Sequence, residues 1–400
     1  MPSPITMIDL FAGCGGMTQG FVSAKGYRPI MSVEWDYSAA STYAANFGES
    51  HTRWGDIAHI PDEEIPPADL IIGGPPCQGF SNLGSRDVND PRNKLWKEYI
   101  RFVRHARPKV FVIENVDRFR SSSEFELLLA EVLPGGLLEG YELTHDLLLA
   151  ADFGVSQRRT RAIVIGSRIG KIPMPERTHA KPDTLDSVRL KPWATVRDAI
   201  EGLPATPTTT ELPASKANYF GREVAGVFKG LDLHIGRNPT DRSLERYDHI
   251  PPGGGRFDLP DHLLSDCWRN KKTGTTDVMG RMRWDAPSLT IRTEFYKPEK
   301  GQYLHPHWLE REHPGNVNRP ITQLEAAKLQ SFPDEFMWCG SKIEIAKQIG
   351  NAVPPRLAEA IARHIKPYLL GQNATAESGS TTGQVPAARR AARQRNGSPR

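Results

Sequence analysis

A cysteine in the first hundred residues stands where a nucleophile could work. Cys77 belongs to the segment Pro75-Pro76-Cys77-Gln78-Gly79-Phe80-Ser81, which follows the apolar run Asp69-Leu70-Ile71-Ile72. If that run is a buried strand, the thiol lies at its carboxyl end, where open α/β sheets bind their ligands. Two prolines fix the backbone before the thiol, and Gly79 lets the chain turn away. A reactive cysteine needs such a rigid, partly exposed position, although a small buried thiol would give the same pattern.

A glycine-rich turn near the N-terminus is typical of the first βαβ unit of a nucleotide-binding sheet. The strand-like Ile5-Thr6-Met7-Ile8 leads into Asp9-Leu10-Phe11-Ala12-Gly13-Cys14-Gly15-Gly16, and a helix is predicted from Met17 to Lys25. The glycines let a ligand approach the backbone, and the helix N-terminus offers free amides to an anion. The next predicted strand, Tyr27 to Val33, ends in Glu34, about 20 residues past the glycines, where an acidic residue can bind ribose hydroxyls.

Two later segments place charged side chains at the edges of predicted strands. Glu114 ends the apolar stretch of Pro108-Lys109-Val110-Phe111-Val112-Ile113-Glu114-Asn115-Val116. Its carboxylate could cap the following turn or, beside a thiol, donate a proton. Gln157-Arg158-Arg159-Thr160-Arg161 enters the predicted strand Ala162-Ile163-Val164-Ile165. In a strand Arg159 and Arg161 share one face, which could be a solvated basic edge or part of a site.

In this order, the segments resemble the DNA (cytosine-5) methyltransferases, the bacterial modification enzymes. The resemblance runs from Met7 to about Leu370. It continues through Arg319-Pro320-Ile321-Thr322 with Glu325-Ala326-Ala327-Lys328-Leu329-Gln330-Ser331-Phe332-Pro333-Asp334, and it closes with Gln348-Ile349-Gly350-Asn351-Ala352-Val353-Pro354-Pro355. Six ordered blocks are far more specific than any single one. The resemblance implies an α/β fold: a Rossmann-like S-adenosylmethionine-dependent methyltransferase domain with a mostly parallel sheet, plus a smaller loop-rich target-recognition domain.

The resemblance also implies covalent catalysis on cytosine. Carbon 5 of cytosine is a poor nucleophile toward a methyl sulfonium, and addition of a thiolate to carbon 6 makes an enamine whose carbon 5 can attack. Cys77 is then the nucleophile, and Glu114 is the acid that contacts ring nitrogen 3. The remaining implied residues are Asn115, which helps to hold the pocket, Arg161, which reaches the carbonyl oxygen of cytosine, and Arg159, which supports the loop or a nearby phosphate.

The implied cofactor is S-adenosyl-L-methionine, with S-adenosyl-L-homocysteine as the product and no metal. Phe11 is expected to pack on adenine, and the Gly13 to Gly16 turn to approach the methionine part. Glu34 is expected to hold the ribose, while Asp56 accepts from the adenine amino group. The other residues expected at this cofactor site are Ala12, Cys14, Gly15, Trp35, Ile57, Pro76, Leu95, Asn351 and Ala352.

The implied substrate is double-stranded DNA, whose target base must be flipped out of the stack. Gln78 and Ser81 belong to a loop that closes on DNA in this family. Specificity elements are expected between about Pro192 and Arg319, where no family motif maps individual residues. The candidates are the stretches Arg281 to Arg283, Thr290 to Tyr296 and Lys297 to Gly301, and within them Arg281, Arg283 and Arg292. We expect a monomeric enzyme of the bacterial cytoplasm, either paired with a cognate restriction endonuclease or acting as an orphan methylase.

Composition excludes several other classes. The chain has 400 residues and 38% apolar content, enough for two or three domains with real cores. No apolar run approaches the ~20 residues of a membrane span, and no secretory signal is visible. The four cysteines are scattered and form no Cys-x-x-Cys pair, which argues against a zinc site or disulfide framework and suits a reducing compartment.

The distribution of charged residues along the chain helps to predict the domain boundaries. Residues 157 to 320 hold 27 Lys and Arg against 20 Asp and Glu, whereas the rest of residues 1 to 370 holds 19 against 26. A basic middle segment is what a domain that grips nucleic acid would produce. We therefore predict a catalytic cofactor-binding domain over 1–185, completed by a C-terminal helix over 346–370. Residues 186–345 form the target-recognition domain, and 371–400 a disordered basic tail.

Three rival functions can be compared with this interpretation. An amino-group DNA methyltransferase needs an aromatic residue after the Pro-Pro pair to stack the base, and Cys77 takes that position here. A cytosine-5 enzyme acting on RNA is the nearer rival, and the basic middle segment favours duplex DNA. A silent DNA-binding regulator would have no reason to keep Cys77, Glu114 and Arg161 together.

Overall fold

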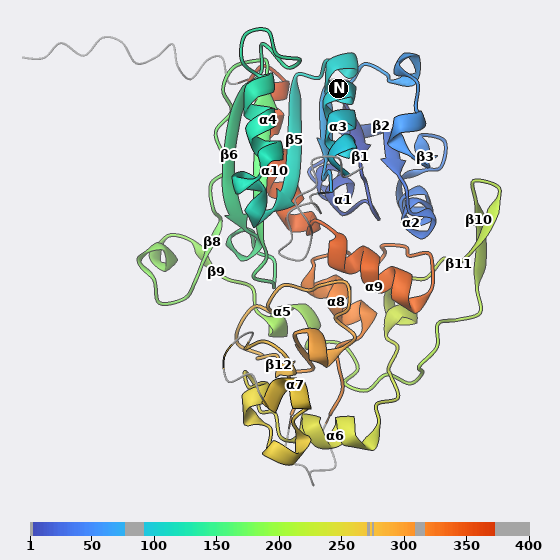
Figure 1. Ribbon diagram of the computed structural model, residues 1–400, viewed down its shortest axis with the longest axis vertical. Coiled ribbons are helices and arrows are strands. Elements are labelled where there is room, and N and C mark those ends of the chain that lie inside the picture. The colour runs from blue at the N-terminus through green and yellow to red at the C-terminus, as the bar shows by residue number, and fades with distance from the viewer. Residues whose placement is uncertain (1–2, 77–91, 270–272, 274–275, 309–316, 373–400) are drawn as a thin grey trace, which may run out of the picture.

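A twisted sheet with helices on both faces forms the upper part of the molecule in Figure 1. The computed structural model describes residues 3–76, 92–269, 273, 276–308 and 317–372. Within them seven strands make one sheet in the order β3-β2-β1-β4-β5-β7-β6. The strands are β1 (Ile5–Leu10), β2 (Tyr27–Glu34), β3 (Thr52–Trp54), β4 (Leu70–Gly73), β5 (Val110–Val116), β6 (Glu142–Leu149) and β7 (Thr160–Ser167).

The sheet is mostly parallel, as the sequence predicted. The strands from β3 through β5 pair in parallel, while β7 runs antiparallel to both β5 and β6. The central strands β1, β4 and β5 are almost entirely buried, which explains their continuous apolar runs. Their carboxyl ends lie at the same edge, which therefore collects Leu10, Gly73 and the end of β5.

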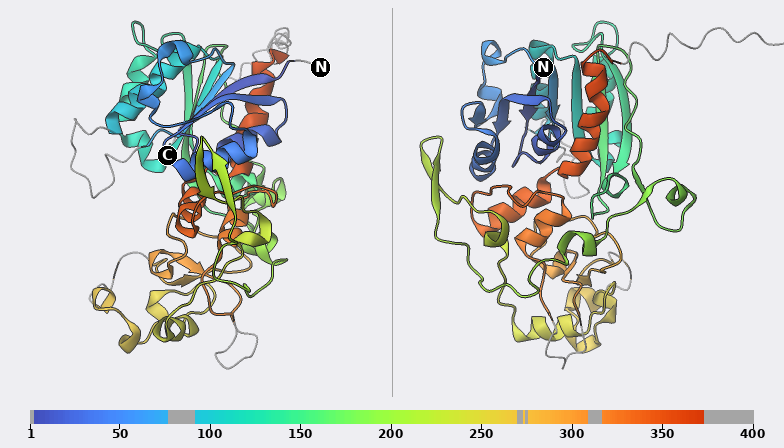
Figure 2. Two further views of the ribbon diagram at one scale, coloured as in Figure 1. Left: turned by 90° about the vertical axis from the view of Figure 1, so that its right-hand side faces the viewer. Right: turned by 180° about the vertical axis from the view of Figure 1, so that it is seen from behind.

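Two hydrophobic cores fix the helices to this sheet. On one face, α1 (Gly16–Ser23) and α10 (Pro355–Leu369) pack together against β1, β4 and β5. On the other, α3 (Arg92–Ala106) and α4 (Ser123–Glu131) cover the sheet through aromatic residues such as Tyr99, Phe102 and Phe125. Figure 2 shows the sheet edge-on between these two layers. The remaining helix, α2 (Tyr37–Phe47), packs against β2 and β3.

The lower part of the molecule has short elements and long connections. Its strands are β8 (His179–Ala180), β9 (Lys191–Pro192), β10 (Lys216–Tyr219), β11 (Arg222–Ala225), β12 (Gly280–Arg281) and β13 (Gln302–Leu304). Its helices are α5 (Val196–Ile200), α6 (Asp241–Asp248), α7 (Asp266–Arg269), α8 (Gln323–Leu329) and α9 (Lys342–Asn351). We call this part the second lobe; its main core joins α5, α8 and α9 with buried aromatic residues, among them Phe228, Phe332 and Trp338.

A buried charged cluster anchors α8. Thr322 and Glu325 form a capping box at its N-terminus. Glu325 is fully buried, and its two carboxylate oxygens accept hydrogen bonds of 2.7 and 2.8 Å from Arg319. Burial alone would raise the pKa of Glu325, but the hydrogen bonds and charge of Arg319 outweigh it and lower that pKa to about 2. Arg319 therefore holds Glu325, and with it the first turn of α8, in place.

The C-terminal segment differs in one respect from the expected single helix over 346–370. It forms two helices, because Pro354 and Pro355 end α9 and start α10. Position 346 falls inside α9, which packs with α8 and α2, while α10 returns to the sheet (Figure 1). Within the described ranges, no helix is long and apolar enough to cross a membrane.

Candidate active site at the carboxyl edge of the sheet

The ends of β4 and β5 bring the predicted catalytic segments together. Cys77, Gln78 and Ser81 lie outside the described residues, and the description stops at Pro76. One residue earlier, the carbonyl of Pro75 accepts a 2.8 Å hydrogen bond from the side-chain amide of Asn115. The side-chain oxygen of Asn115 in turn accepts a hydrogen bond from the backbone N–H of Val116. Asn115 thus ties the chain that leads to Cys77 onto the end of β5.

A largely buried ion pair lies beside this junction. Arg161 Nε lies 2.8 Å from Glu114 Oε1, and the two side chains are only 14% and 10% exposed. The pair forms because β5 and β7 are antiparallel neighbours, with Val116 opposite Arg161. The second carboxylate oxygen of Glu114 faces Gly74, where an added Cβ would lie 3.1 Å from it. The edge therefore presents a carboxylate and a guanidinium side by side, next to the segment that carries the thiol.

Arg159 has a different environment from Arg161. Its side chain is buried, and it donates a 3.0 Å hydrogen bond to the carbonyl of Ile291 and a long one, 3.5 Å, to that of Asn351. Burial, with the nearby charge of Arg161, lowers its pKa to about 9. Arg159 therefore joins the catalytic edge to the second lobe, at Ile291 and at the C-terminal end of α9.

A buried amide chain next to Arg159 was not foreseen. Gln157 Oε1 accepts from the backbone N–H of Ile291, and its Nε2 donates to Gln330 Oε1 over 2.8 Å. Gln330 Nε2 donates in turn to the carbonyl of Ile349. Both glutamines are fully buried. They belong to two of the segments that carried the resemblance, but nothing in either segment indicates that the two side chains meet.

The glycine-rich turn meets Glu34 at the end of β1. Gly13 has a positive φ of 56°, and its N–H donates a 2.7 Å hydrogen bond to Glu34 Oε2. The other oxygen, Oε1, accepts from the N–H of Asp36 at 2.7 Å. Burial raises the pKa of Glu34. A Cβ built on Gly13 would meet no atom within 4 Å, so the space beside the turn is open.

The other predicted cofactor residues form two groups. The residues that are at least partly exposed make up, together with Glu34, what we call the cofactor rim, and the buried residues support it. Trp35 is 70% exposed beside Glu34, and Phe11 is partly exposed. Asp56 accepts a hydrogen bond from the N–H of Ala58 through one carboxylate oxygen. Further around the edge, Pro76 and Leu95 are partly buried and Asn351 is exposed. The remaining ones are buried, namely Ala12, Cys14, Gly15, Gly16, Ile57 and Ala352. Two carboxylates, exposed aromatic surface and an open turn fit a nucleoside cofactor.

Cys14 is a support residue. It packs in the core of the second lobe, and its thiol lies 3.8 Å from the carbonyl of Gln348. Burial raises its pKa to about 12, so the thiol stays protonated near neutral pH. A buried, protonated thiol is unreactive, so Cys14 serves in packing, and its place at the cofactor site stays a prediction.

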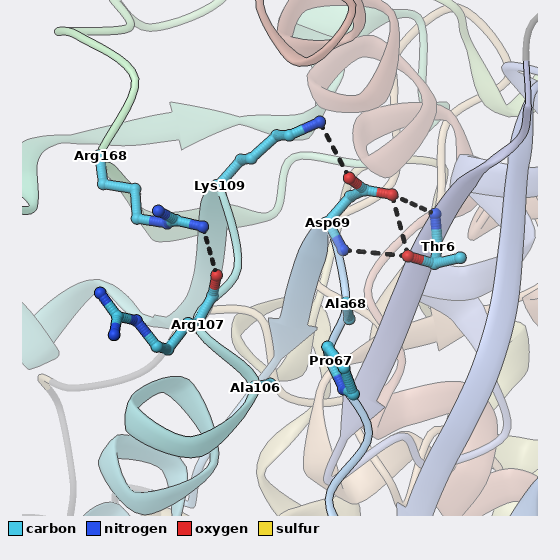
Figure 3. A pocket seen from close by; sticks show the side chains of 8 residues that line it. All are labelled: Thr6, Pro67, Ala68, Asp69, Ala106, Arg107, Lys109 and Arg168. Carbon is cyan, nitrogen blue, oxygen red and sulfur yellow. Dashed lines mark hydrogen bonds and ion pairs between the residues drawn. The ribbon is translucent and has the colours of Figure 1, made fainter.

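A pocket of about 460 Å³ at the opposite, amino-terminal edge of the sheet has a different character (Figure 3). Asp69 accepts from the N–H and hydroxyl of Thr6 and pairs with Lys109 at 3.0 Å. Arg168 donates to the backbone carbonyls of Pro108 and Arg107. These charged groups bind one another or the backbone, and the pocket is remote from the edge where α/β sheets bind ligands.

The three arginines proposed to contact DNA have unequal environments. Arg281 is fully buried and donates to the carbonyls of Ile250, His305 and Tyr247 and to Asn318 Oδ1. The prediction that it contacts DNA is therefore wrong: its guanidinium holds the second lobe together. Arg283 and Arg292 are 57% and 54% exposed and pair with Asp285 and Asp277. Both remain predicted DNA contacts.

Comparison with known proteins decides the family. The model of the C-5 cytosine-specific DNA methylase family matches residues 5–367. The chain belongs to this family. It is 34% identical over 373 residues to the type II methyltransferase M1.HphI of Haemophilus parahaemolyticus, covering 90% of this chain and 86% of that one. With M.DdeI of Desulfomicrobium norvegicum it shares 30% identity over 398 residues, covering 92% and 90%.

Solved structures agree with this methylase assignment. A protein described as a DNA modification methyltransferase encoded within an E. coli prophage superposes with a TM-score of 0.63 at 26% identity, covering 92% of this chain and 99% of that one. The Dnmt2 methyltransferase of S. pombe shares the fold, with a TM-score of 0.60 at 16% identity over 91% of this chain and 99% of that one. The predicted α/β methyltransferase fold and the predicted enzyme class, a DNA cytosine-5 methyltransferase, are confirmed.

Proposed function

We propose that this methylase transfers a methyl group from S-adenosyl-L-methionine to carbon 5 of a flipped-out cytosine within a specific duplex DNA sequence, through a covalent bond to Cys77. The observation that carries the proposal is the Glu114–Arg161 pair, which lies beside the Pro75–Asn115 junction just before Cys77. Cytosine presents ring nitrogen 3 and its carbonyl oxygen side by side. A carboxyl and a guanidinium 2.8 Å apart match that edge, the carboxyl facing nitrogen 3 and the guanidinium facing the oxygen.

The residues of this chain then have defined tasks. The thiolate of Cys77 adds to carbon 6 while protonated Glu114 gives its proton to nitrogen 3, which leaves carbon 5 electron-rich. The cofactor would supply the methyl group that carbon 5 takes. Glu114 then takes its proton back from nitrogen 3, and a water molecule removes the proton from carbon 5. The electron pair of that C–H bond restores the double bond between carbons 5 and 6 and expels the Cys77 thiolate, which frees the enzyme. Asn115 keeps the thiol segment in place, and Arg161 holds the base by its carbonyl oxygen.

The cofactor residues follow from the rim described above. Glu34 would bind ribose hydroxyls, Asp56 the adenine amino group through the oxygen not bonded to Ala58, and Phe11 and Trp35 the faces of the base. The open space beside Gly13 supports this placement. In the second lobe, Arg283 and Arg292 would contact DNA, with Gln78 and Ser81 on the catalytic side. We propose that the enzyme is a cytoplasmic monomer. It would either belong to a restriction-modification system or act as an orphan methylase.

The test is transfer of labelled methyl groups from S-adenosylmethionine to plasmid DNA by the purified protein, followed by bisulfite sequencing. We expect 5-methylcytosine at one short recurring sequence. The Glu114→Gln variant should bind the cofactor but turn over at least about 100-fold more slowly, because the proton donor is lost. Label found in RNA alone, or on an exocyclic amino group of DNA, would contradict the proposal.

A further inference from the structure

A hairpin of the second lobe reaches back to the cofactor edge of the sheet. It consists of β10 and β11, antiparallel strands in which Tyr219 pairs with Arg222. Figure 1 shows it rising from the second lobe toward α2, while at its base the carbonyl of Ala225 accepts a 2.8 Å hydrogen bond from the N–H of Gly340, just before α9. Lys216 and Glu223 form an ion pair whose side chains are 70% and 62% exposed, so this pair takes no part in the contact with the sheet domain. The tip of the hairpin makes that contact.

The tip makes a dense set of contacts with α2 and β3. The Tyr37 hydroxyl lies 2.5 Å from the carbonyl of Arg222 and 3.0 Å from that of Tyr219. The guanidinium of Arg222 lies 5.1 Å from the ring centre of Tyr37 and 5.0 Å from that of Trp54. Cation–π attraction is effective at these distances. Phe220 adds a ring contact with Trp54 at 6.2 Å, and its N–H donates to Glu49.

The two aromatic residues that the tip holds are joined directly to the cofactor rim. Trp54 is the last residue of β3 and pairs with Glu34 in β2. Its indole N–H donates a 3.1 Å hydrogen bond to the carbonyl of Trp35. Tyr37 follows Asp36, whose N–H holds Glu34 Oε1, and its ring packs edge-on against Trp54 at 4.9 Å. Arg222 is therefore separated from the segment Glu34-Trp35-Asp36 by a single layer of side chains.

We infer that the β10–β11 hairpin is a latch on the cofactor rim, with Arg222 as a positioning residue that holds Trp54 and Tyr37 and thereby the conformation of Glu34 and Trp35. The inference rests on the proposed use of S-adenosylmethionine. The hairpin thereby links the two lobes at this rim: it belongs to the second lobe and contacts Tyr37 and Trp54, which flank the segment that carries Glu34.

The test compares cofactor binding without DNA, by calorimetry with S-adenosylmethionine, in the full chain and its variants. Arg222→Ala should weaken binding about 3- to 30-fold, the range expected when one cation–π interaction is removed. Arg222→Lys should restore much of it because a cation remains over the rings. Lys216→Ala is the matched control: it removes a cation from the same hairpin and should bind like the unmodified chain.

A second variant tests the hydrogen bond from Trp54 to Trp35, through which the hairpin would act on the cofactor rim. Trp54→Phe keeps an aromatic face for Arg222 but removes the hydrogen bond to the Trp35 carbonyl, so cofactor binding should weaken while the melting temperature changes little. In steady state, both Arg222→Ala and Trp54→Phe should raise KM for the cofactor with kcat nearly unchanged. If the unmodified chain binds the cofactor and both variants bind within twofold of it, the latch is wrong. If the unmodified chain does not bind, the proposed function falls, and the latch with it.

Discussion

At the scale of single residues, Asp9 stands out as a buried carboxyl group that the proposed chemistry does not use. It is 1% exposed and accepts a 2.6 Å hydrogen bond from the Thr18 hydroxyl, which also lies 3.1 Å from the hydroxyl of Tyr43. Burial raises its pKa from 3.8 to about 7, with the charge of Glu34 adding to the effect. The folded protein therefore favours protonated Asp9 below that pH.

A pH dependence of stability follows from this shift. Because the folded pKa lies above the unfolded one, the contribution of Asp9 is fully present below pH 3.8 and is lost as pH rises through about 7. Asp9→Asn, which keeps an acceptor for Thr18, should not show this loss. From pH 5 to pH 8, the free energy of unfolding of Asp9→Asn should rise by roughly 2–3 kcal/mol relative to that of the unmodified chain. Denaturant unfolding at several pH values measures this; parallel pH profiles for the two proteins would refute it.

The role of a single residue could be predicted only where that residue belongs to a family motif. Glu114, Asn115 and Arg161 were assigned roles in the sequence, and the structure places all three at one edge beside Pro75. Arg281 and Arg283 lie two positions apart with the same side chain, yet one is buried and the other exposed. No local pattern distinguishes them, because the burial of Arg281 depends on acceptors that are distant in the sequence, namely the carbonyls of Tyr247, Ile250 and His305 and the side chain of Asn318.

At the scale of elements, α1 and α10 approach each other unusually closely at Gly20. A Cβ on Gly20 would lie 2.4 Å from the carbonyl oxygen of Pro355 and 2.5 Å from the Cβ of Ala358. Both contacts are below the distances that real Cβ atoms show. The helix from the N-terminal turn and the last helix of the described chain therefore pack backbone against backbone at this point.

Gly20→Ala should accordingly destabilise the protein. The helices must separate to admit the methyl group, which should cost about 1–3 kcal/mol, as overpacked cores do. Gly202→Ala is the matched control, because a Cβ there meets nothing within 4 Å. Chemical denaturation of both variants measures the difference. Equal stability of Gly20→Ala and the unmodified chain would show that α1 and α10 pack less tightly than the structure indicates.

Long periodic elements were predictable, and short irregular ones were not. The last helix carries an apolar stripe with helical spacing, namely Leu357, Ile361, Ile365 and Leu369, and all four residues are buried against the sheet. The β10–β11 hairpin was not predicted, because two strands of four residues in a region rich in proline and glycine carry too little periodicity. Its contacts with Tyr37 and Trp54 are set by tertiary structure alone.

At the scale of the whole molecule, charge is distributed unevenly between the parts of the chain. Of the excess of seven basic residues in 157 to 320, five lie in residues 157 to 171, which include β7, and residues 373–400 add five Arg against one Glu. Arginines that contact phosphates release counterions, so their contribution to DNA binding depends on salt. The C-terminal arginines can thus add affinity without sequence specificity.

Removal of residues 373–400 should separate these contributions. The truncated protein should keep its melting temperature, its cofactor affinity and its methylated sequence. Its log–log salt slope for DNA binding should become shallower by at most about 0.9 for each phosphate that the tail no longer neutralises. Fluorescence anisotropy at several salt concentrations measures the slope. A truncated protein that fails to fold or to bind the cofactor would mean that these residues complete the fold.

The most direct test of the account is covalent trapping of Cys77 on DNA that carries 5-fluorocytosine at the methylated position. Thiolate addition and methyl transfer can both proceed, but the last step must remove a proton from carbon 5, and fluorine cannot leave as a cation. With S-adenosylmethionine present, the protein should form an adduct that survives denaturing electrophoresis, with Cys77 in the cross-linked peptide. Cys77→Ser should neither cross-link nor turn over, since a neutral hydroxyl is a weak nucleophile. Full methylation of cytosine by Cys77→Ser would contradict the covalent mechanism.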